Sequence, residues 1–430
     1  MNIPRSRLFW AVSLGHFTND MFTSMMSVLL AFISINVLPM SKSQIGLVLG
    51  ITALVGALSQ PIFGLLADRS GGRWLGAGGV AWTVGMLLLG VLAAENGIYP
   101  LMVLFFVIPA LGSGAFHPVG SKYAAESDRT RAASNMAYFF LMGQLGLGLG
   151  PALAGRLLDR AATFNHVFTD PLGPAFRGVL LERGTVTPVL LVALFAIPAV
   201  LFMLFMIPGQ RKHRAQQEAE RQLHPVAPAR VTFPVLAFVV LISMVTLRSL
   251  AQPGVVNFIP VLFQEKGWSP ADYGLITSSF WVGSGLAGVF FGNLADYYDR
   301  RRVIALSMIA SAPAFFFLPI TDGALAFALA IAAGALSGAS HSIIVVLAQG
   351  LLPGSKALAS GLILGLIFGM GAVGNFLIGW MAEAINLGTA FQIVAGVTVV
   401  ASLLALALPA NSQPAAKTAP EPVASAQPLR

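Results

Sequence analysis

Long apolar runs recur along this chain of 430 residues, and each is long enough to cross a lipid bilayer. A transmembrane helix needs about 20 consecutive, mainly apolar residues. Only 10% of the residues are charged, whereas soluble globular proteins carry about 25%. A water-soluble protein of this length would need many more charges to cover its surface. The runs therefore predict an all-α membrane protein and exclude a soluble enzyme.

The apolar segments predict twelve transmembrane helices in two groups of six. The first group covers residues 1–209 and the second covers 232–409. Between them, residues 210–231 form the longest polar stretch, which predicts a cytoplasmic linker. Residues 410–430 are rich in Pro, Ala and Ser and predict a disordered cytoplasmic tail. The expected spans lie near 8–37, 44–67, 75–95, 98–123, 132–158, 188–208, 232–262, 271–296, 303–320, 324–350, 357–384 and 388–409.

Basic residues predict the orientation of the chain in the membrane. An even number of spans places both termini and the linker on one side, and most Lys and Arg residues fall on that side. Since Lys and Arg accumulate in cytoplasmic loops, we expect cytoplasmic termini. The net charge of +8 has the same origin, together with anionic lipid at the cytoplasmic surface, so we expect lipid partners and no nucleic acid.

An internal repeat relates the two groups of spans. Residues 64–73 and residues 292–302 both begin with Gly-x-Leu-Ala-Asp and continue with basic residues. Residues 114–117 read Gly-Ala-Phe-His and residues 338–341 read Gly-Ala-Ser-His, at nearly the same separation. Parallel repeats of this kind are a known plan for membrane transporters.

The segment at residues 64–73 resembles the signature loop of the major facilitator superfamily. The second copy is degenerate, with Asp299 at the place of the second glycine. The resemblance implies two six-helix bundles and a cytoplasmic latch that opens and closes during alternating access. The matching positions are Gly64, Asp68, Arg69, Gly71 and Arg73 in the first copy, and Gly292, Asp296 and Arg300 in the second.

Two further segments narrow the resemblance. The fifth predicted span resembles an element typical of proton-coupled efflux members, with matching positions Gly146, Gly150, Pro151 and Gly155. Gly-His-Phe-x-x-Asp at residues 15–20 and Phe-His-Pro at residues 116–118 resemble the fosmidomycin-resistance branch, which exports drugs. The fourth predicted span lacks the arginine that many drug/proton antiporters carry there.

Five ionisable residues lie well inside the predicted spans. A charged side chain at mid-bilayer costs at least about 2.5–3.5 kcal/mol, so such residues face a cavity or a partner. In the superfamily the helices that carry them line the central cavity. We expect a substrate site formed by these five residues together with Asn19 and Gln252. The five are His16, Asp20, His117, Arg248 and His341.

Within this set, Asp20 is the expected proton carrier, with His117 and His341 as alternatives. Arg248 offers a fork for a carboxylate, a phosphate or a phosphonate. Purely structural roles stay open: Asp20 and Arg248 as an ion pair across the two halves, and each histidine as a packed hydrogen-bond donor. No histidine cluster has the spacing of a metal site, and Cys is absent, so we expect neither a metal nor a cofactor.

These features together predict proton-coupled efflux of a small drug-like or anionic compound by a monomer in the bacterial inner membrane. Uptake of an organic anion is one alternative, and a non-transporting sensor or a lipid flippase is another. The chain contains no Walker-type loop that would indicate ATP as the energy source. It also shows no set of nucleophile, base and acid that would indicate an enzyme.

Overall fold

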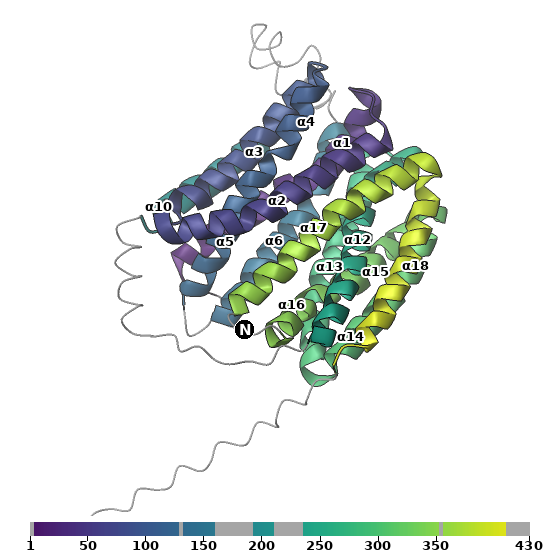
Figure 1. Cartoon of the computed structure of the whole chain (residues 1–430). Helices are drawn as coiled ribbons and strands as arrows, with labels where there is room; N and C mark the ends of the chain where they lie inside the picture. Colours follow the sequence, from purple (N-terminus) through teal and green to yellow (C-terminus); the bar gives the residue numbers. More distant parts are fainter. Residues whose placement is uncertain (1–3, 129–131, 160–191, 210–234, 352–355, 410–430) are drawn as a thin grey trace, which may run out of the picture.

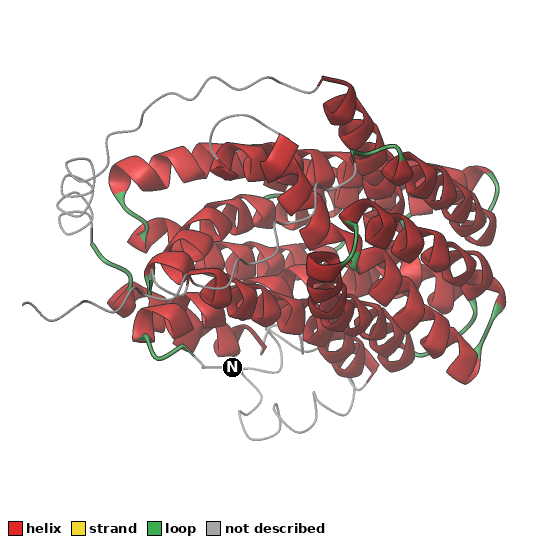
Figure 2. Cartoon of the chain, turned by 90° about the horizontal axis from the view of Figure 1, so that it is seen from below, coloured by secondary structure: helices red, strands yellow, loops and turns green. Residues whose placement is uncertain are grey.

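The computed structural model describes residues 4–128, 132–159, 192–209, 235–351 and 356–409. Within these ranges every regular element is a helix (Figure 2). The predicted linker at 210–231 and the predicted tail at 410–430 lie outside the described residues.

The helices of the first half precede residue 209, and those of the second half follow residue 234. The first half contains α1 (Arg7–Asn36), α2 (Lys42–Ser70), α3 (Arg73–Glu95), α4 (Tyr99–Val107), α5 (Pro109–Glu126), α6 (Ala132–Asp159), η2 (Ala193–Phe195) and α10 (Ala196–Met206). The second half contains α12 (Val235–Glu265), α13 (Pro270–Tyr297), α14 (Arg300–Phe317), η3 (Leu318–Ile320), α15 (Gly323–Gly338), α16 (Ser340–Leu351), α17 (Lys356–Ala384) and α18 (Leu387–Leu406).

The described helices match the predicted spans. In the described part of the chain, 11 helices are long and apolar enough to cross a membrane. The predicted span at 188–208 corresponds to the shorter apolar stretch Ala193–Met206, because residues up to 191 lie outside the described part. The prediction of an all-α, multi-pass membrane protein is confirmed.

Two spans that we expected to be continuous are interrupted. The first is divided between α4 and α5 at Ile108, and the second between α15 and α16 at Ala339. Carbonyl groups at both interruptions accept hydrogen bonds from side chains: Trp82 donates to the Ile108 carbonyl at 2.8 Å, and Arg248 donates to the Ser337 carbonyl at 3.2 Å. Irregular backbone at membrane depth requires such partners, since no water is there to provide them.

The two halves meet at one end of the molecule and separate toward the other (Figure 1). At the joined end, where α1 finishes and α2 begins, Lys42 forms an ion pair with Glu265. The Gln264 amide in α12 donates a hydrogen bond to the Ala31 carbonyl in α1. The separated end contains the start of α1, the end of α2 and the start of α17.

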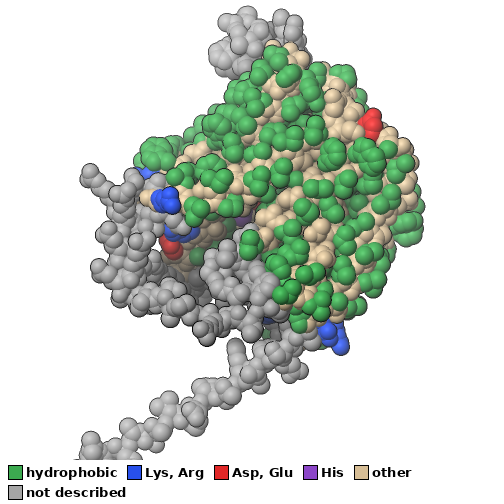
Figure 3. Space-filling model, viewed as in Figure 1, with side chains coloured by type: hydrophobic (Ala, Val, Ile, Leu, Met, Phe, Trp, Pro, Cys, Tyr) green, Lys and Arg blue, Asp and Glu red, His purple; other side chains and the backbone are tan. Residues whose placement is uncertain are grey.

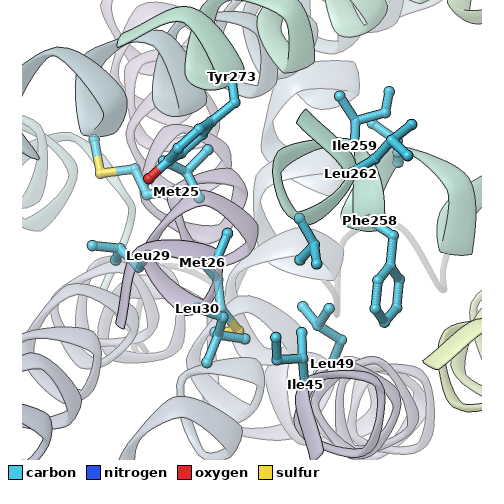
Figure 4. Close-up of a cluster of buried hydrophobic side chains, with 14 of the residues drawn as sticks. Met25, Met26, Leu29, Leu30, Ile45, Leu49, Phe258, Ile259, Leu262 and Tyr273 are labelled. Carbon is cyan, nitrogen blue, oxygen red and sulfur yellow. The ribbon is translucent and has the colours of Figure 1, made fainter. Parts of the chain in front are cut away.

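The hydrophobic core follows the same division. At the joined end, one buried cluster includes residues of both halves, among them Met25 and Leu29 of α1, Ile45 of α2, and Phe258 and Leu262 of α12 (Figure 4). Toward the separated end the core splits into two clusters. One belongs to the first half and includes Phe9, Phe116 and Met203; the other belongs to the second half and includes Leu241, Ile304 and Ile344.

Glycine pairs allow the halves to touch at the joined end. Where α6 crosses α13, a Cβ atom placed on Gly155 would lie 3.1 Å from the Gly274 Cα atom. Where α2 crosses α17, a Cβ atom on Gly46 would lie 3.0 Å from the Gly379 Cα atom. Lipid provides no hydrophobic force that drives helices together, so such small residues, which let backbones pack closely, stabilise the contact.

We predict that Gly155→Ala lowers the midpoint of thermal unfolding in detergent, because the added methyl group meets backbone atoms of α13. The expected cost is about 1–3 kcal/mol, typical of overpacking. The matched control is Gly78→Ala on α3, where an added Cβ atom has no neighbour within 4 Å. Equal midpoints for the two variants would contradict this role of Gly155.

Candidate functional site

Helix α1 is enclosed along most of its length, although it carries many polar side chains. Between Phe9 and Ser34 almost every residue is buried. The buried polar residues of this helix are Ser13, His16, Thr18, Asn19, Asp20, Ser24, Ser27 and Ser34. Since polar groups are costly at membrane depth, this helix is where partners and function are expected.

A carboxylate between two imidazoles forms the centre of the site. Asp20 Oδ2 lies 3.2 Å from His16 Nε2, one turn earlier on α1. Asp20 Oδ1 lies 3.4 Å from His117 Nε2, which comes from α5. The structure thus brings together three residues that the sequence marked separately. We call them the His–Asp–His cluster.

The second nitrogen of each ring sets its tautomer. His16 Nδ1 lies 2.8 Å from the Phe139 carbonyl oxygen, and His117 Nδ1 lies 2.9 Å from the Ser113 carbonyl oxygen. A carbonyl oxygen only accepts, so each Nδ1 carries a hydrogen. In the neutral rings each Nε2 then has its lone pair toward Asp20. Three acceptors therefore face one another, and the cluster needs at least one added proton or another cation.

Asn19 holds this carboxylate in place. Its amide donates to Asp20 Oδ1 and to Ser113 Oγ, both at 3.0 Å, and its carbonyl oxygen accepts from Thr83 Oγ1 at 3.1 Å. The side chain is 0% exposed. We expected Asn19 in the substrate site; its contacts instead connect α1 to α3 and α5 and position Asp20.

Helix α6 covers the cluster with an aromatic ring and a glycine. The Phe139 ring stacks on His16 with a centroid distance of 4.1 Å. A Cβ atom at Gly143 would lie 2.9 Å from Asp20 Oδ2, so a side chain at this position would crowd the carboxylate. Gly143, Thr83 and Ser113 were not predicted from the sequence as part of the site. Of the three, only Ser113 could have been found from the sequence, because it lies one helical turn before His117.

Arg248 occupies the second half. It is 3% exposed, and it donates from Nε to Ser340 Oγ at 2.7 Å and from Nη2 to the Ser337 carbonyl oxygen at 3.2 Å. In the described part of the chain no carboxylate lies within ion-pair distance of Arg248. The Asp20–Arg248 pair that the sequence left open is therefore not formed in this conformation.

The remaining predicted site residues lie near Arg248. His341 directly follows Ser340 on α16. Gln252 lies one turn after Arg248 on α12, and both Gln252 and His341 are partly buried.

The first copy of the signature loop joins α2 to α3. Gly71 ends α2 with a φ of 83°, a backbone conformation that favours glycine. Arg73 donates from Nε to the Ile207 carbonyl oxygen at 2.8 Å, whereas Arg69 is exposed. A Cβ atom on Gly64 would lie 3.6 Å from Pro118 of α5. The side chain of Asp68 lies outside the described residues, so its expected role in the latch stays a prediction.

The second copy joins α13 to α14. Asp299 caps α14 by accepting from the Arg301 backbone N–H at 3.1 Å, and its carboxylate pairs with Arg301 Nε at 2.7 Å. Gly292 and Arg300 are partly buried, and the side chain of Asp296 lies outside the described residues. The aspartate that replaces glycine in this copy thus acts as a helix cap.

The model of the Major Facilitator Superfamily matches residues 12–264 and 241–430. The chain belongs to this superfamily. It is a transporter rather than an enzyme. The family resemblance inferred from residues 64–73 and 292–302 is confirmed.

Relatives in this superfamily include a protein named for drug resistance. The chain is 26% identical to the fosmidomycin resistance protein of Escherichia coli strain K12, over 93% of this chain and 92% of that protein. It is also 26% identical to the uncharacterized MFS-type transporter YfnC of Bacillus subtilis strain 168, over 94% of this chain and 92% of that protein.

Solved structures show the same fold. A bacterial homolog of the human lysosomal transporter Spinster, inward-facing and occupied, superimposes with a TM-score of 0.72 at 16% identity, over 95% of this chain and 97% of the other. The inward-open xylose transporter XylE of E. coli superimposes with a TM-score of 0.67 at 16% identity, over 94% of this chain and 96% of the other. These likenesses support the major facilitator fold.

We predict that Asn19→Ala destabilises the protein by about 1–3 kcal/mol, because Thr83, Ser113 and Asp20 lose a buried hydrogen-bond partner. Thermal unfolding in detergent measures this loss. Asn96→Ala is the matched control, because Asn96 is exposed and donates only within its own helix. A midpoint for Asn19→Ala as high as that of the control would disprove the positioning role.

Proposed function

We propose that this transporter exports a small anionic or amphipathic compound in exchange for protons, by alternating access across the bacterial inner membrane. The observation that carries the proposal is the His–Asp–His cluster. Its three facing acceptors require a shared hydrogen, and a group that must hold a proton inside the membrane is suited to carrying one.

The cluster is a self-contained proton store. The titratable groups that contact Asp20 in the described part of the chain are His16 on the same helix and His117 on α5. The other polar partner is the neutral amide of Asn19. Because these three side chains contact one another directly, we propose that they share the transported proton.

The shape of the molecule supports access from one side at a time. The halves share a core at the joined end and have separate cores at the other. A hollow lies between the halves, with a histidine surface visible inside it (Figure 3). Because basic residues gather at the separated end, we place that end in the cytoplasm. The conformation is then inward-facing, as in the two solved relatives described above.

Arg248 is the proposed anion site. A buried guanidinium without a nearby carboxylate is costly, and an anionic substrate would supply the missing charge. Its Nη1 group has no hydrogen-bond partner among the described residues and is available for a carboxylate, phosphate or phosphonate. We place Gln252 and His341 beside the substrate as further polar contacts.

Two further features favour export over uptake. The fifth predicted span, now α6, carries the element typical of proton-coupled efflux members, and three of its glycines lie at close helix contacts. The E. coli relative is named for resistance to fosmidomycin. Fosmidomycin is therefore the first probe to use.

In proteoliposomes, we predict that the wild-type protein accumulates labelled fosmidomycin in vesicles with an acidic interior, since antiport moves substrate toward the acidic compartment. Asp20→Asn should abolish the effect of the pH gradient while leaving gradient-independent exchange. Asp272→Asn, an exposed carboxylate in the first turn of α13, is the matched control. Accumulation in vesicles with an alkaline interior would show symport and overturn the proposal.

We also predict that Arg248→Lys weakens binding of an anionic substrate at least about tenfold more than binding of a neutral analogue. A lysine ammonium lacks the fixed planar fork that would bond Ser340, Ser337 and the substrate at the same time. Competition of each compound against labelled probe gives the two affinities. Arg156→Lys, on an exposed position of α6, serves as the control. An equal loss for both compounds would assign Arg248 a structural role.

A further inference from the structure

The His–Asp–His cluster also has the arrangement of a metal site. One ring nitrogen of each histidine and one carboxylate oxygen of Asp20 all lie within 4.8 Å of one another. From the sequence we expected no metal, because no histidine cluster has the spacing of a metal site and Cys is absent. Only the packing of α5 against α1 brings the three ligands together.

The separations in the cluster suit a small tetrahedral ion. The two nitrogen-to-oxygen distances are 3.2 and 3.4 Å. In a tetrahedral zinc site with bonds of about 2.0–2.1 Å, neighbouring ligand atoms lie about 3.3 Å apart. Each histidine nitrogen already lies at about this distance from one oxygen of the Asp20 carboxylate, His16 from Oδ2 and His117 from Oδ1. Coordination of one ion requires that the two imidazole rings and the carboxylate turn toward it.

The hydrogen bonds around the cluster match those around histidine ligands in metal sites. A metal-bound imidazole almost always donates its other ring hydrogen to a carbonyl or a carboxylate. His16 donates to the Phe139 carbonyl, and His117 donates to the Ser113 carbonyl. Asn19 in turn holds the carboxylate. These hydrogen bonds thus direct the Nε2 lone pairs of His16 and His117 toward Asp20, as metal ligation requires.

The ligand types select the kind of ion. Two imidazoles and one carboxylate suit zinc and the neighbouring divalent transition metals, whereas magnesium and calcium prefer sites made of oxygen. Three protein ligands leave a fourth position for water or for another molecule, as in catalytic zinc sites.

One side of the cluster is reachable. The His117 side chain is 29% exposed, whereas those of Asp20 and His16 are 11% and 5% exposed. An ion would therefore enter past His117, and its fourth ligand would lie on the same side. Gly143 leaves no room for a side chain on the opposite side, where α6 covers His16 and Asp20.

The geometry points to a binding site for one divalent transition-metal ion, with Zn²⁺ as the best match, formed by His16, Asp20 and His117. The ion supplies the positive charge that the three acceptors need, and it takes the place of the proton at this position. Binding depends on the cluster alone and not on the direction of transport.

The test uses the full-length, untagged protein in detergent. Zn²⁺ binding is measured by calorimetry, and Co²⁺ binding by the visible absorption that a tetrahedral cobalt site produces. The wild-type chain should bind one ion with an affinity in the micromolar range or better. His117→Ala and the nearly isosteric Asp20→Asn should each weaken binding at least about tenfold. Loss of a residue that only hydrogen-bonds to a metal ligand already weakens metal binding by about this much.

His341→Ala is the matched control, because it removes a membrane-embedded histidine from the second half and should leave ion affinity and the cobalt spectrum unchanged. Gly143→Ala is a further variant that keeps all three ligands but crowds them, and it should also weaken binding. Thermal midpoints without metal identify any variant that does not fold.

Absence of binding by the wild-type protein overturns the metal site, and so does unchanged affinity in both His117→Ala and Asp20→Asn. The proton proposal is judged separately. Loss of pH-driven exchange in Asp20→Asn without metal binding by the wild type supports the proton store alone. Metal binding together with unchanged coupling in Asp20→Asn supports the metal site alone.

Discussion

A membrane interior has no water to hydrate a charge, and the described structure depends on this constraint. Asp20 and Arg248 are the charged side chains that are buried in the described part of the chain, and each is surrounded by partners. Asp20 lies between two imidazoles and an amide, and Arg248 between a hydroxyl and a carbonyl. The carbonyl groups freed at Ile108 and Ser337 are also bonded by side chains of neighbouring helices. Each half thus carries one buried charge and one interrupted helix, and in the second half Arg248 bonds directly to residues at the interruption.

The way the core is divided determines where the halves hold together. A joint core, two glycine pairs and the Lys42–Glu265 ion pair connect the halves at one end. At the other end each half retains its own core, so the halves separate there without exposing a shared hydrophobic surface. Stability within each half is therefore compatible with a weak contact between halves at this end, which the proposed alternating access requires.

The sequence predicted the spans, the repeat and the family, because these depend on local runs of residues and on short motifs. It singled out His16, Asn19 and Asp20 on α1, but it did not specify their individual contacts. The interruptions at Ile108 and Ala339 were not predicted. Pro109 follows the first and Gly338 precedes the second, but Gly and Pro are common in membrane helices and do not by themselves mark a break. Asn19 was expected to meet substrate, and His117 was not connected to Asp20. Those contacts depend on how α1, α3 and α5 rotate against one another, which a helical period within one segment does not specify.

The His–Asp–His cluster draws all its contacts from α1, α5 and α6, and Asn19 extends them to α3. All four helices belong to the first half. A rigid rotation of one half against the other therefore leaves every bond length in the cluster unchanged. Such a rotation changes the proton or metal affinity of the cluster only through its solvent exposure and its distance from charges of the second half, such as Arg248. In the proposed antiport, the free energy for directed movement then enters as a difference in electrochemical potential between the two compartments, and substrate at Arg248 would decide when the halves rotate.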